Sequence, residues 1–478
     1  MNTGEVPGYE FEVPRGPRHG YGPRHAGGHD QAMRQLRHPA QHSLAPAPAP
    51  RSAVRGVFAV MRKRNWLLGV AAPILAAVAV GIAVVVVSGG GGGNGVAPSA
   101  LAAGFPPARL AGADFTGTGA NSRVTLDAIG AAAGTEVAAG AANGGPALWV
   151  SADGGSEWTR AALGGPASLS KAGTGEIAGV AHGRAGWVAV GTTLAAAGGP
   201  LVVASPDART WTAAGGIAGR PAGSAVAAAV AAGPAGYVIV GHQSSGRNGA
   251  TAAAWYAPGL SGWRSATFTG PASTGTGATG QLMNAVAATA SGFTAVGSAG
   301  TSAAAWLSPD GRSWRQVSLP EPDGAARAAL EYVAANGASL VAAGTAFSAS
   351  GASRPFAEVS ADAGATWTVV QLPTPGNGPG AGTTVTALTA AAGGFTATGT
   401  YLTSAGPEVV VWTLPPGTLV TAGTGWTAVT PQGQGLATAN AENAITALTV
   451  DGATLTGVGF TVGPKASGPT LWQSPIRY

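Results

Sequence analysis

The sequence predicts an all-β fold built from seven four-stranded sheets. Three observations lead to this prediction: a tryptophan that closes a turn recurs about every fifty residues, three short apolar runs precede each of these tryptophans, and no stretch beyond residue 88 has a helical period. Four-stranded units repeated at about fifty residues are typical of a β-propeller, in which each unit forms one blade of a ring.

The repeated tryptophans divide the chain into units of similar length. They are separated by 53, 52, 51, 53 and 59 residues, at Trp158, Trp211, Trp263, Trp314, Trp367 and Trp426. The apolar runs before them are short, rich in Val, Ala, Thr and aromatic residues, and bounded by Gly or Pro, as strands are. They are clearest at 176–182, 186–192 and 200–205, at 284–289, 292–298 and 303–308, and at 385–390, 394–400 and 408–413.

The number of first strands predicts seven blades, with six or eight as alternatives. These strands begin near Arg123, Glu176, Ala225, Asn284, Ala329, Thr384 and Ala444. The seventh unit ends at Tyr478 after three strands, so its fourth strand would have to come from before the first unit. The segment ARLAGADF (108–115) is available for that role, and such a closure would leave no sheet edge exposed.

Residues 1–65 are predicted to form a disordered basic tail. Gly, Pro, His and Arg dominate this segment, which cannot bury enough apolar surface to offset the entropy of ordering its backbone. Residues 1–64 contain ten Lys or Arg and four acidic residues, a net charge of +6, whereas residues 88–478 have a net charge of −1. The basic character of the chain belongs to the tail, and no nucleic-acid partner is predicted.

Residues 66–88 are predicted to form a transmembrane helix, so the lipid bilayer is an expected partner. Residues 67–87 carry no charge, and as a helix they would be about 31 Å long, which matches a hydrocarbon core. Basic residues precede the span, which places the N-terminus in the cytoplasm, a Gly-rich linker at 89–104 and the propeller at 105–478 outside the cell. The alternative is a cleaved signal peptide with a site at 100–102, but such peptides are only about 15–30 residues long.

Composition excludes several kinds of site. Only 9% of the residues are charged and there is no cysteine, so neither a disulfide nor a thiolate metal site can form. The sequence contains no phosphate-binding loop, no Ser/His/Asp signature and no clustered metal-ligand spacing, so no cofactor and no metal are predicted. His182 and His242, the two histidines beyond the span, are expected in loops.

Four of the turns that end in tryptophan share a Ser-x-Asp pattern. They read SADGGSEW (151–158), SPDARTW (205–211), SPDGRSW (308–314) and SADAGATW (360–367), whereas the turns 256–263 and 423–426 keep the tryptophan without the aspartate. In such a turn the aspartate accepts backbone N–H groups, and the tryptophan packs between neighbouring sheets. The residues predicted to hold these turns are Ser151, Asp153, Gly155, Trp158, Ser205, Asp207, Trp211, Ser308, Asp310, Trp314, Ser360, Asp362, Gly364 and Trp367.

This pattern resembles the Asp-box (BNR) repeat, S-x-D-x-G-x-T-W, of sialidase-like propellers. SADAGATW matches it fully and SADGGSEW nearly so, while the other two turns are one residue shorter between Asp and Trp. The resemblance implies the propeller architecture and places the turns on the outer rim, away from any central pocket. A sialidase would also need an arginine triad, a tyrosine nucleophile with an acidic partner, and an acid/base aspartate.

That catalytic set is not found in the sequence. Arg123 is the nearest candidate for an arginine on a first strand, since most other arginines lie at the tryptophan turns. Tyr332 has a neighbouring acid in Glu331, but adjacent residues of a strand point to opposite faces. The prediction is therefore that the chain is not an enzyme and has no catalytic, cofactor-binding or metal-binding residue.

The predicted function is that of a non-catalytic propeller, anchored in a bacterial envelope, that presents a binding face to a protein or a cell-wall glycan. Two alternatives stay open. One is a divergent, envelope-anchored glycoside hydrolase. The other is an assembly scaffold for a membrane complex, like the photosystem assembly factors that the repeats also resemble. The sequence assigns no ligand-binding residue to any of these functions.

Overall fold

The computed structural model describes residues 124–164, 175–193, 199–215, 217, 225–244, 249–269, 280–375, 382–391, 393–403, 406–417, 425–431, 442–462 and 467–476. The predicted tail (1–65), membrane span (66–88), linker (89–104) and closing segment (108–115) lie outside these residues. In the part of the chain that is described, no helix is both long and apolar enough to cross a membrane.

Blades 1 and 2 begin the ring. Blade 1 contains β1 (Val124–Ala132), β2 (Thr135–Ala142), β3 (Gly145–Ser151) and β4 (Thr159–Arg160), paired in that order. Blade 2 contains β6 (Gly175–Gly183), β7 (Gly186–Thr193), β8 (Gly199–Ser205) and β9 (Thr210–Ala213). A fifth strand, β5 (Ala162–Gly164), arrives from blade 1 and pairs in parallel with β9 at the outer edge.

Blades 3 and 4 repeat this arrangement. Blade 3 contains β10 (Ala225–Gly233), β11 (Gly236–Ser244), β12 (Ala250–Ala257) and β13 (Arg264–Ser265). Blade 4 contains β15 (Gln281–Thr289), β16 (Gly292–Ala299), β17 (Ser302–Ser308) and β18 (Ser313–Val317). The strand β14 (Thr267–Thr269) follows β13 in the chain and pairs in parallel with β18 of the next blade.

Blades 5 to 7 complete the ring. Blade 5 contains β19 (Arg327–Asn336), β20 (Ser339–Phe347), β21 (Ser353–Ser360) and β22 (Thr368–Gln371). Blade 6 contains β23 (Thr384–Ala391), β24 (Gly394–Thr403), β25 (Gly406–Leu414) and β26 (Thr427–Val429). Blade 7 has three described strands, β27 (Glu442–Asp451), β28 (Thr454–Val462) and β29 (Ser467–Pro475).

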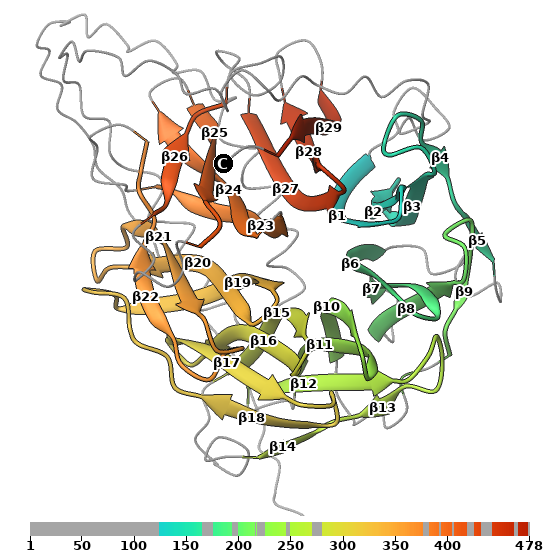
Figure 1. The fold of residues 1–478 in the computed structure, drawn as a ribbon, viewed down its shortest axis with the longest axis horizontal. Helices are drawn as coiled ribbons and strands as arrows, with labels where there is room; N and C mark the ends of the chain where they lie inside the picture. The colour runs from blue at the N-terminus through green and yellow to red at the C-terminus, as the bar shows by residue number, and fades with distance from the viewer. Residues whose placement is uncertain are drawn as a thin grey trace, which may run out of the picture. The chain divides into compact units, whose positions relative to one another are not determined.

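The prediction of seven blades is confirmed. The first strand of each blade contacts the first strand of the next, and β27 of blade 7 contacts β1, so the blades close into a ring (Figure 1). The first strands begin within three residues of the positions that the repeats predict. The fifth strands β5 and β14 were not predicted, because each lies in a segment whose repeat-to-repeat pattern is too short to stand out.

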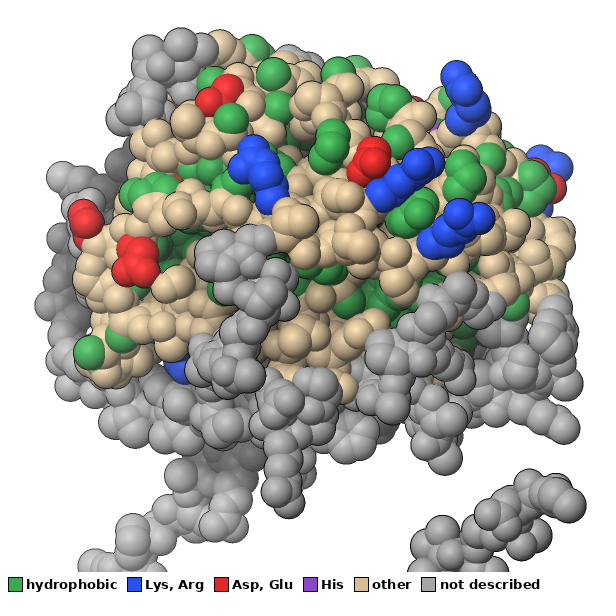
Figure 2. Space-filling view, turned by 90° about the horizontal axis from the view of Figure 1, so that it is seen from below, with side chains coloured by type: hydrophobic (Ala, Val, Ile, Leu, Met, Phe, Trp, Pro, Cys, Tyr) green, Lys and Arg blue, Asp and Glu red, His purple; other side chains and the backbone are tan. Residues whose placement is uncertain are grey.

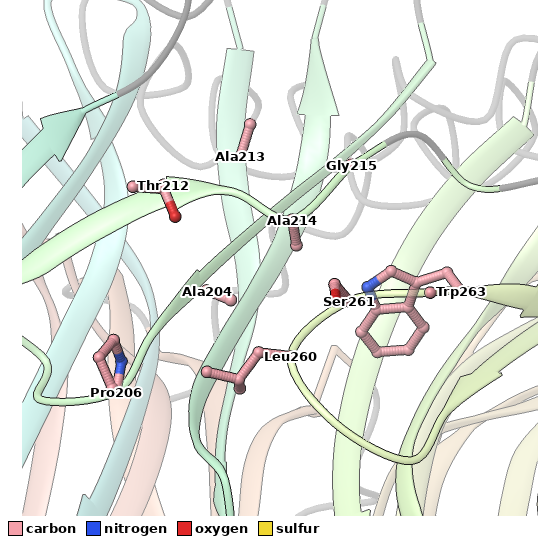
Figure 3. Close-up of a pocket in the computed structure, with 10 residues that line it drawn as sticks. Ala204, Pro206, Thr212, Ala213, Ala214, Gly215, Leu260, Ser261 and Trp263 are labelled. Atoms are coloured by element: carbon pink, nitrogen blue, oxygen red, sulfur yellow. The ribbon is translucent and has the colours of Figure 1, made fainter.

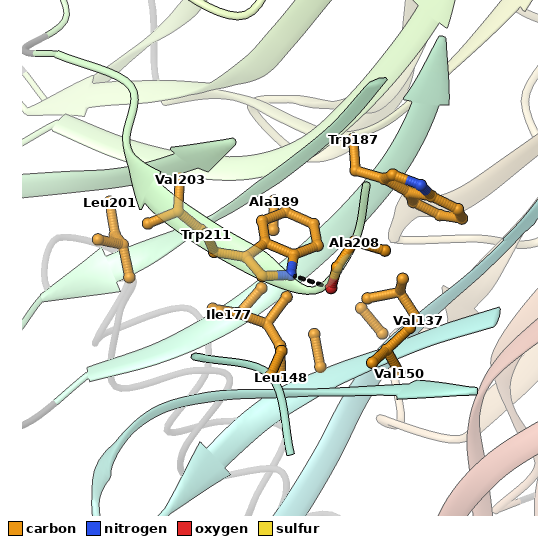
Figure 4. Close-up of a cluster of buried hydrophobic side chains, with 13 residues drawn as sticks. Val137, Leu148, Val150, Ile177, Trp187, Ala189, Leu201, Val203, Ala208 and Trp211 are labelled. Carbon is orange, nitrogen blue, oxygen red and sulfur yellow. Dashed lines mark hydrogen bonds between the residues drawn. The ribbon is translucent and has the colours of Figure 1, made fainter. Parts of the chain in front are cut away.

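The core lies between the blades. Each of the seven interfaces holds its own cluster of buried apolar side chains, because both faces of every sheet are covered. On β2, for example, Val137 and Ala139 face blade 2 while Ala138 faces blade 7, and none of the three is exposed. Figure 4 shows the cluster between blades 1 and 2, in which Trp211 packs with Ile177, Leu148 and Val203.

Candidate functional site

The four Ser-x-Asp turns share one pattern of hydrogen bonds. In the turn that ends at Trp158, the buried Ser151 hydroxyl donates to Asp153 Oδ1 (2.7 Å) and accepts from the Gly155 N–H (2.8 Å). Asp153 Oδ1 in turn accepts the N–H groups of Ser156 and Glu157. The other three turns place their serine–aspartate pairs in the same way, at Ser205–Asp207, Ser308–Asp310 and Ser360–Asp362.

The same turns satisfy the indole N–H of their tryptophan. In each, the nitrogen donates to the carbonyl oxygen three residues earlier: Trp158 to Gly155 (3.0 Å), Trp211 to Ala208 (2.7 Å), Trp314 to Gly311 (3.1 Å) and Trp367 to Gly364 (2.8 Å). Figure 4 draws this bond for Trp211. Trp263 and Trp426, whose turns lack the aspartate, have buried indole nitrogens with no acceptor among the described residues.

These bonds favour the ionised form of Asp153, Asp207 and Asp362. The Ser151 hydroxyl is the first cause that keeps the pKa of Asp153 below its usual value, and backbone N–H groups add to it. The Arg209 N–H does so for Asp207, and the Thr366 side chain for Asp362. Each of these aspartates is exposed, and each is bonded within its own turn. The geometry therefore gives them a turn-stabilising role within single blades and does not bring them together.

The strands that surround the ring axis carry a second repeated feature. Each of the seven innermost strands has a β-bulge between its third and fifth residue, where the pairing with the second strand skips one residue. The skipped residues, which we call the axial ring, are half-buried: Asp127, Ala178, Ala228, Asn284, Glu331, Thr386 and Thr446.

A glycine lies opposite each bulge. The residue just before the bulge is always paired with glycine, at positions 140, 191, 241, 297, 344, 399 and 459. A Cβ atom on any of these glycines would overlap a backbone carbonyl oxygen of the innermost strand. Because only glycine permits this close approach, its recurrence near the middle of every second strand is the sequence signal that identifies the axial ring.

Polar residues of the axial ring join neighbouring blades. Asn284 Nδ2 donates to the Leu330 carbonyl oxygen of blade 5 (2.9 Å), and Thr446 Oγ1 donates to that of Leu126 in blade 1 (2.7 Å). The two acceptors, Leu330 and Leu126, are the residues just before the bulges of blades 5 and 1. Five of the seven members are polar, and the two ionisable ones, Asp127 and Glu331, are acidic. The axial ring therefore offers hydrogen-bonding groups and negative charge, and no member is basic.

Two other carboxyl groups are sealed between blades. Glu136 on β2 is fully buried and accepts a hydrogen bond from Thr456 Oγ1 (2.8 Å) across the interface of blades 7 and 1, and burial raises its pKa to about 7. Glu358 on β21 is also fully buried, and neither of its oxygens has a partner among the described residues. Burial raises the pKa of Glu358 to about 8.

The position of Glu358 explains this unusual environment. Glu358 lies on the third strand of blade 5. Strand pairing aligns it with a tryptophan on the third strand of five other blades: Trp149, Trp255, Trp306, Trp412 and Trp472. Its neighbours in the sheet, Phe356 and Ala342, belong to the apolar cluster between blades 4 and 5. A carboxyl group therefore replaces a large apolar ring in a buried apolar interface, where the neutral form is favoured.

Positive charge is found at the outer edge of the ring. The exposed residues Arg160, Arg209, Arg264, Arg312 and Arg315 all lie in or beside the tryptophan turns of blades 1 to 4. Figure 2 shows most of the blue Lys and Arg side chains of this view on its upper half. The described chain thus combines a mildly acidic axis with an arginine-bearing outer edge.

Several residues considered from the sequence take different places in the structure. His182 and His242 lie in β6 and β11 rather than in loops, and burial lowers the pKa of His242 to about 4. Glu331 is a bulge residue, so the strict alternation that separated it from Tyr332 does not hold there. Arg123 lies outside the described residues. No group of three or more potential metal ligands occurs in the described ranges.

Comparison with known proteins returned only structural similarities. The chain matches no family model, and no curated protein matches its sequence. It is similar to the solved structure of YCF48 from Cyanidioschyzon merolae, with 14% identity, a TM-score of 0.47 and coverage of 78% of this chain and 99% of that one. It is also similar to Hadza microbial sialidase Hz136 (12% identity, TM-score 0.39, coverage 72% and 74%) and to the NanB sialidase of Streptococcus pneumoniae (10%, 0.37, 80% and 70%). No statement about activity follows from these similarities.

Proposed function

We propose that this chain is a non-catalytic, membrane-anchored propeller of a bacterial envelope that binds a protein or a cell-wall glycan at the axis of its ring. The observation that carries the proposal is the axial ring. Seven bulges bring one residue from every blade to the innermost strands, and five of these residues have hydrogen-bonding side chains. A propeller commonly binds its ligands at such an axial position.

The distribution of carboxyl groups supports a role without catalysis. Acid–base catalysis on a substrate requires a carboxyl group with a shifted pKa that the substrate can reach. Glu136 and Glu358, two described carboxyl groups whose pKa values are raised, are fully buried between blades. The turn aspartates Asp153, Asp207 and Asp362 are exposed, have lowered pKa values and are bonded to their own backbone.

A binding experiment combined with a turnover assay tests this proposal. The full chain in mild detergent would be incubated with isolated cell-wall sacculi, with a glycan array and with crosslinked envelope proteins. We expect binding without hydrolysis. The double substitution Asp127→Asn and Glu331→Gln should weaken that binding at least tenfold, whereas the exposed Thr251→Ala on blade 3 should leave it unchanged.

The alternatives give different results in the same experiment. Hydrolysis that a single carboxylate substitution abolishes would favour the glycoside hydrolase and contradict our proposal. Stable co-purification with one membrane complex, unaffected by the axial substitutions, would favour the assembly scaffold.

The anchor is tested separately by cell fractionation. A chain that lacks residues 66–88 should move from the membrane to the soluble fraction, whereas one that lacks residues 89–95 should stay in the membrane. Protease added outside intact spheroplasts should digest the propeller of the parent chain and spare its tail. Digestion of the tail alone would show that the proposed orientation is wrong.

A further inference from the structure

Five exposed arginines lie at one end of blades 2, 3 and 4. The strands of a blade are antiparallel, so the turn between its first and second strands lies at the same end as the turn between its third and fourth strands. The five arginines lie in these turns or within the first three residues of the outer strand that follows. Only three other Lys or Arg side chains are described, so this end holds most of the described positive charge. We call the five residues the arginine patch: Arg184, Arg209, Arg264, Arg312 and Arg315.

Four members of the arginine patch occupy two positions of the repeat. Arg209 and Arg312 stand two residues before the turn tryptophan. Arg264 and Arg315 directly follow the tryptophan of their blades. The patch is therefore a property of blades 2 to 4 and not of the repeat, because blades 1 and 5 carry small uncharged residues at both positions: Ser156, Thr159, Ala365 and Thr368.

Few acidic residues offset the arginine patch. All residues of the turns at this end of blades 2 to 4 are described, and they include two acids, Asp207 and Asp310. Each accepts backbone N–H groups of its own turn. Five positive charges therefore face two negative ones. At the same end of blades 1, 5 and 7 the described balance is reversed, with one arginine and four acids: Arg160, Asp153, Glu157, Asp362 and Asp451.

One guanidinium of the arginine patch is held by an aromatic ring. Arg312 Cζ lies 5.4 Å from the centroid of the Tyr256 ring on β12 of the preceding blade. This cation–π contact covers one face of the guanidinium and leaves its N–H edge for an anion. A side chain that is already held in place loses less conformational freedom when it binds.

The arginine patch does not surround a pocket for a small ligand. A pocket of about 460 Å³ lies between blades 2 and 3 (Figure 3), but its lining, which includes Pro206, Leu260 and Trp263, is uncharged. The arginines are instead spread over three blades, and most of the blue side chains visible in Figure 2 lie on its upper half. A ligand that meets several of them at once must be broad and anionic, as a membrane that contains anionic lipids is.

The length of the chain before β1 lets this end of the ring reach the membrane. Residues 89–123 separate the predicted span from β1, and these 35 residues can extend over at most about 115 Å. β1 begins at the end of blade 1 that is opposite to the patch, and its nine residues are about 30 Å long. The connection is therefore long enough for either end of the ring to face the bilayer.

We propose that the arginine patch docks on the phosphate groups of anionic lipids, so that blades 2 to 4 face the bilayer. Guanidinium groups bind phosphate oxygens through paired, charge-assisted hydrogen bonds. Basic residues near an anionic membrane surface each add to the attraction, and the acids of blades 1, 5 and 7 keep that side of the ring away from it. This inference rests on the membrane anchor of the proposed function and not on the ligand of the axial ring.

The test measures how close each end of the ring comes to the lipid. The chain has no cysteine, so an introduced cysteine carries a single fluorescent donor. Ala185→Cys puts the donor beside Arg184 in the patch, and Thr301→Cys puts it in an exposed turn at the opposite end of blade 4. Each full chain is placed in lipid nanodiscs that carry an acceptor dye on their headgroups, and energy transfer from donor to lipid is measured.

Energy transfer should depend on the lipid and on the salt concentration. Transfer from residue 185 should rise at least twofold when phosphatidylglycerol replaces about a quarter of the phosphatidylcholine, because the patch is attracted to the anionic headgroups. Sodium chloride at about 0.5 M should reverse the rise, because it screens these charges. Transfer from residue 301 should not rise.

Substitutions in the patch separate charge from structure. Arg209→Gln, Arg264→Gln and Arg315→Gln together should return the transfer from residue 185 to its value in phosphatidylcholine. The matched control replaces the same three arginines by lysine, which keeps the charge and should keep at least half of the rise. Arg354→Gln, exposed at the opposite end of blade 5, should change nothing.

Three results would overturn the proposal. They are equal transfer from residue 185 in the two lipid mixtures, an unchanged rise in the triple glutamine variant, and a rise at residue 301 in place of residue 185. An acidic protein as the true partner would give equal transfer in both mixtures. Soluble polyglutamate would then bind the chain, and the triple glutamine variant would lose that binding.

Failure of the anchor gives a different result. A chain without a membrane span would not co-elute with the nanodiscs, which would contradict the proposed anchor. That chain would then be sedimented with vesicles of the same two lipid mixtures. Sedimentation with the phosphatidylglycerol vesicles alone, lost in the triple glutamine variant, would support the arginine patch without the anchor. No sedimentation with either kind of vesicle would overturn both.

Discussion

Gly344 of β20 faces the carbonyl oxygen of Ala329 on β19 so closely that no Cβ atom fits between them. The pairing is repeated once in every blade, and it is the steric condition for the bulge that forms the axial ring.

Gly344→Ala should therefore destabilise the ring. The added methyl group would force the innermost strand of blade 5 away from β20, at a cost of about 2–4 kcal/mol in the free energy of unfolding. Gly145→Ala is the matched control, because the nearest atom to its added Cβ lies 3.8 Å away, and it should change stability by less than about 0.5 kcal/mol. Urea denaturation followed by tryptophan fluorescence measures both. Equal effects would show that the glycine is not required for the bulge.

Ser360→Ala should weaken the turn that ends at Trp367. The buried Ser360 hydroxyl accepts the Gly364 N–H (2.9 Å) and donates to Asp362 (2.8 Å), so its removal leaves a buried N–H unpaired. We expect a loss of about 1–3 kcal/mol in the free energy of unfolding. The exposed Ser318→Ala serves as control and should be nearly neutral. Two indistinguishable denaturation midpoints would contradict this account of the turn.

Stability should fall as the pH rises from about 4.5 to about 8. Glu358 and Glu136 have pKa values of about 8 and about 7 in the folded chain, against 4.5 for the free side chain. Between these values the unfolded chain releases protons that the folded chain retains. The contribution of the two neutral carboxyl groups to the free energy of unfolding is therefore complete below pH 4.5, and it is lost as the pH rises through their pKa values in the folded chain.

Glu358→Gln isolates this effect. The parent and the variant should be similarly stable near pH 4.5, where both side chains are neutral. At pH 9 the variant should be more stable by roughly 3–5 kcal/mol. A constant difference between parent and Glu358→Gln from pH 4.5 to 9 would show that Glu358 ionises freely in the folded state.

The turn aspartates should make the stability fall at acidic pH. The pKa values of Asp153, Asp207 and Asp362 are lowered by their turns, so the stability they contribute is present above their ordinary value of 3.8 and lost as the pH falls through the folded values. Replacing Asp207 by Asn should flatten the acid side of the profile of thermal midpoint against pH. If the acid side of this profile did not change, the loss of stability at low pH would come from other groups.

Much of the fold follows from the regular spacing of large residues. The tryptophans recur at nearly constant intervals because blades 1 to 6 each carry one indole at the same turn, so the places of these blades could be predicted, and the count of first strands gave the seventh. The bulges were missed because they change strand pairing without changing the apolar pattern. Gly191 and Gly297 fall inside apolar runs that predict ordinary strands, although the recurrence of glycine at this position is a steric requirement.

The buried acids were missed for a different reason. A single glutamate in an apolar strand, such as Glu358, is usually expected to face solvent. Only the alignment of the repeats by strand pairing shows that it stands where Trp306 and Trp412 stand.

The parallel strands β5 and β14 divide the ring unevenly. Each forms backbone hydrogen bonds with the outer strand of the next blade, so β5 joins blades 1 and 2, and β14 joins blades 3 and 4. Among the described strands, no such parallel strand joins blades 2 and 3, 4 and 5, 5 and 6, or 6 and 7. In deuterated water the amides of β13, β22 and β26 should therefore exchange before those of β9 and β18, and unfolding would begin at the junctions that have no added strand.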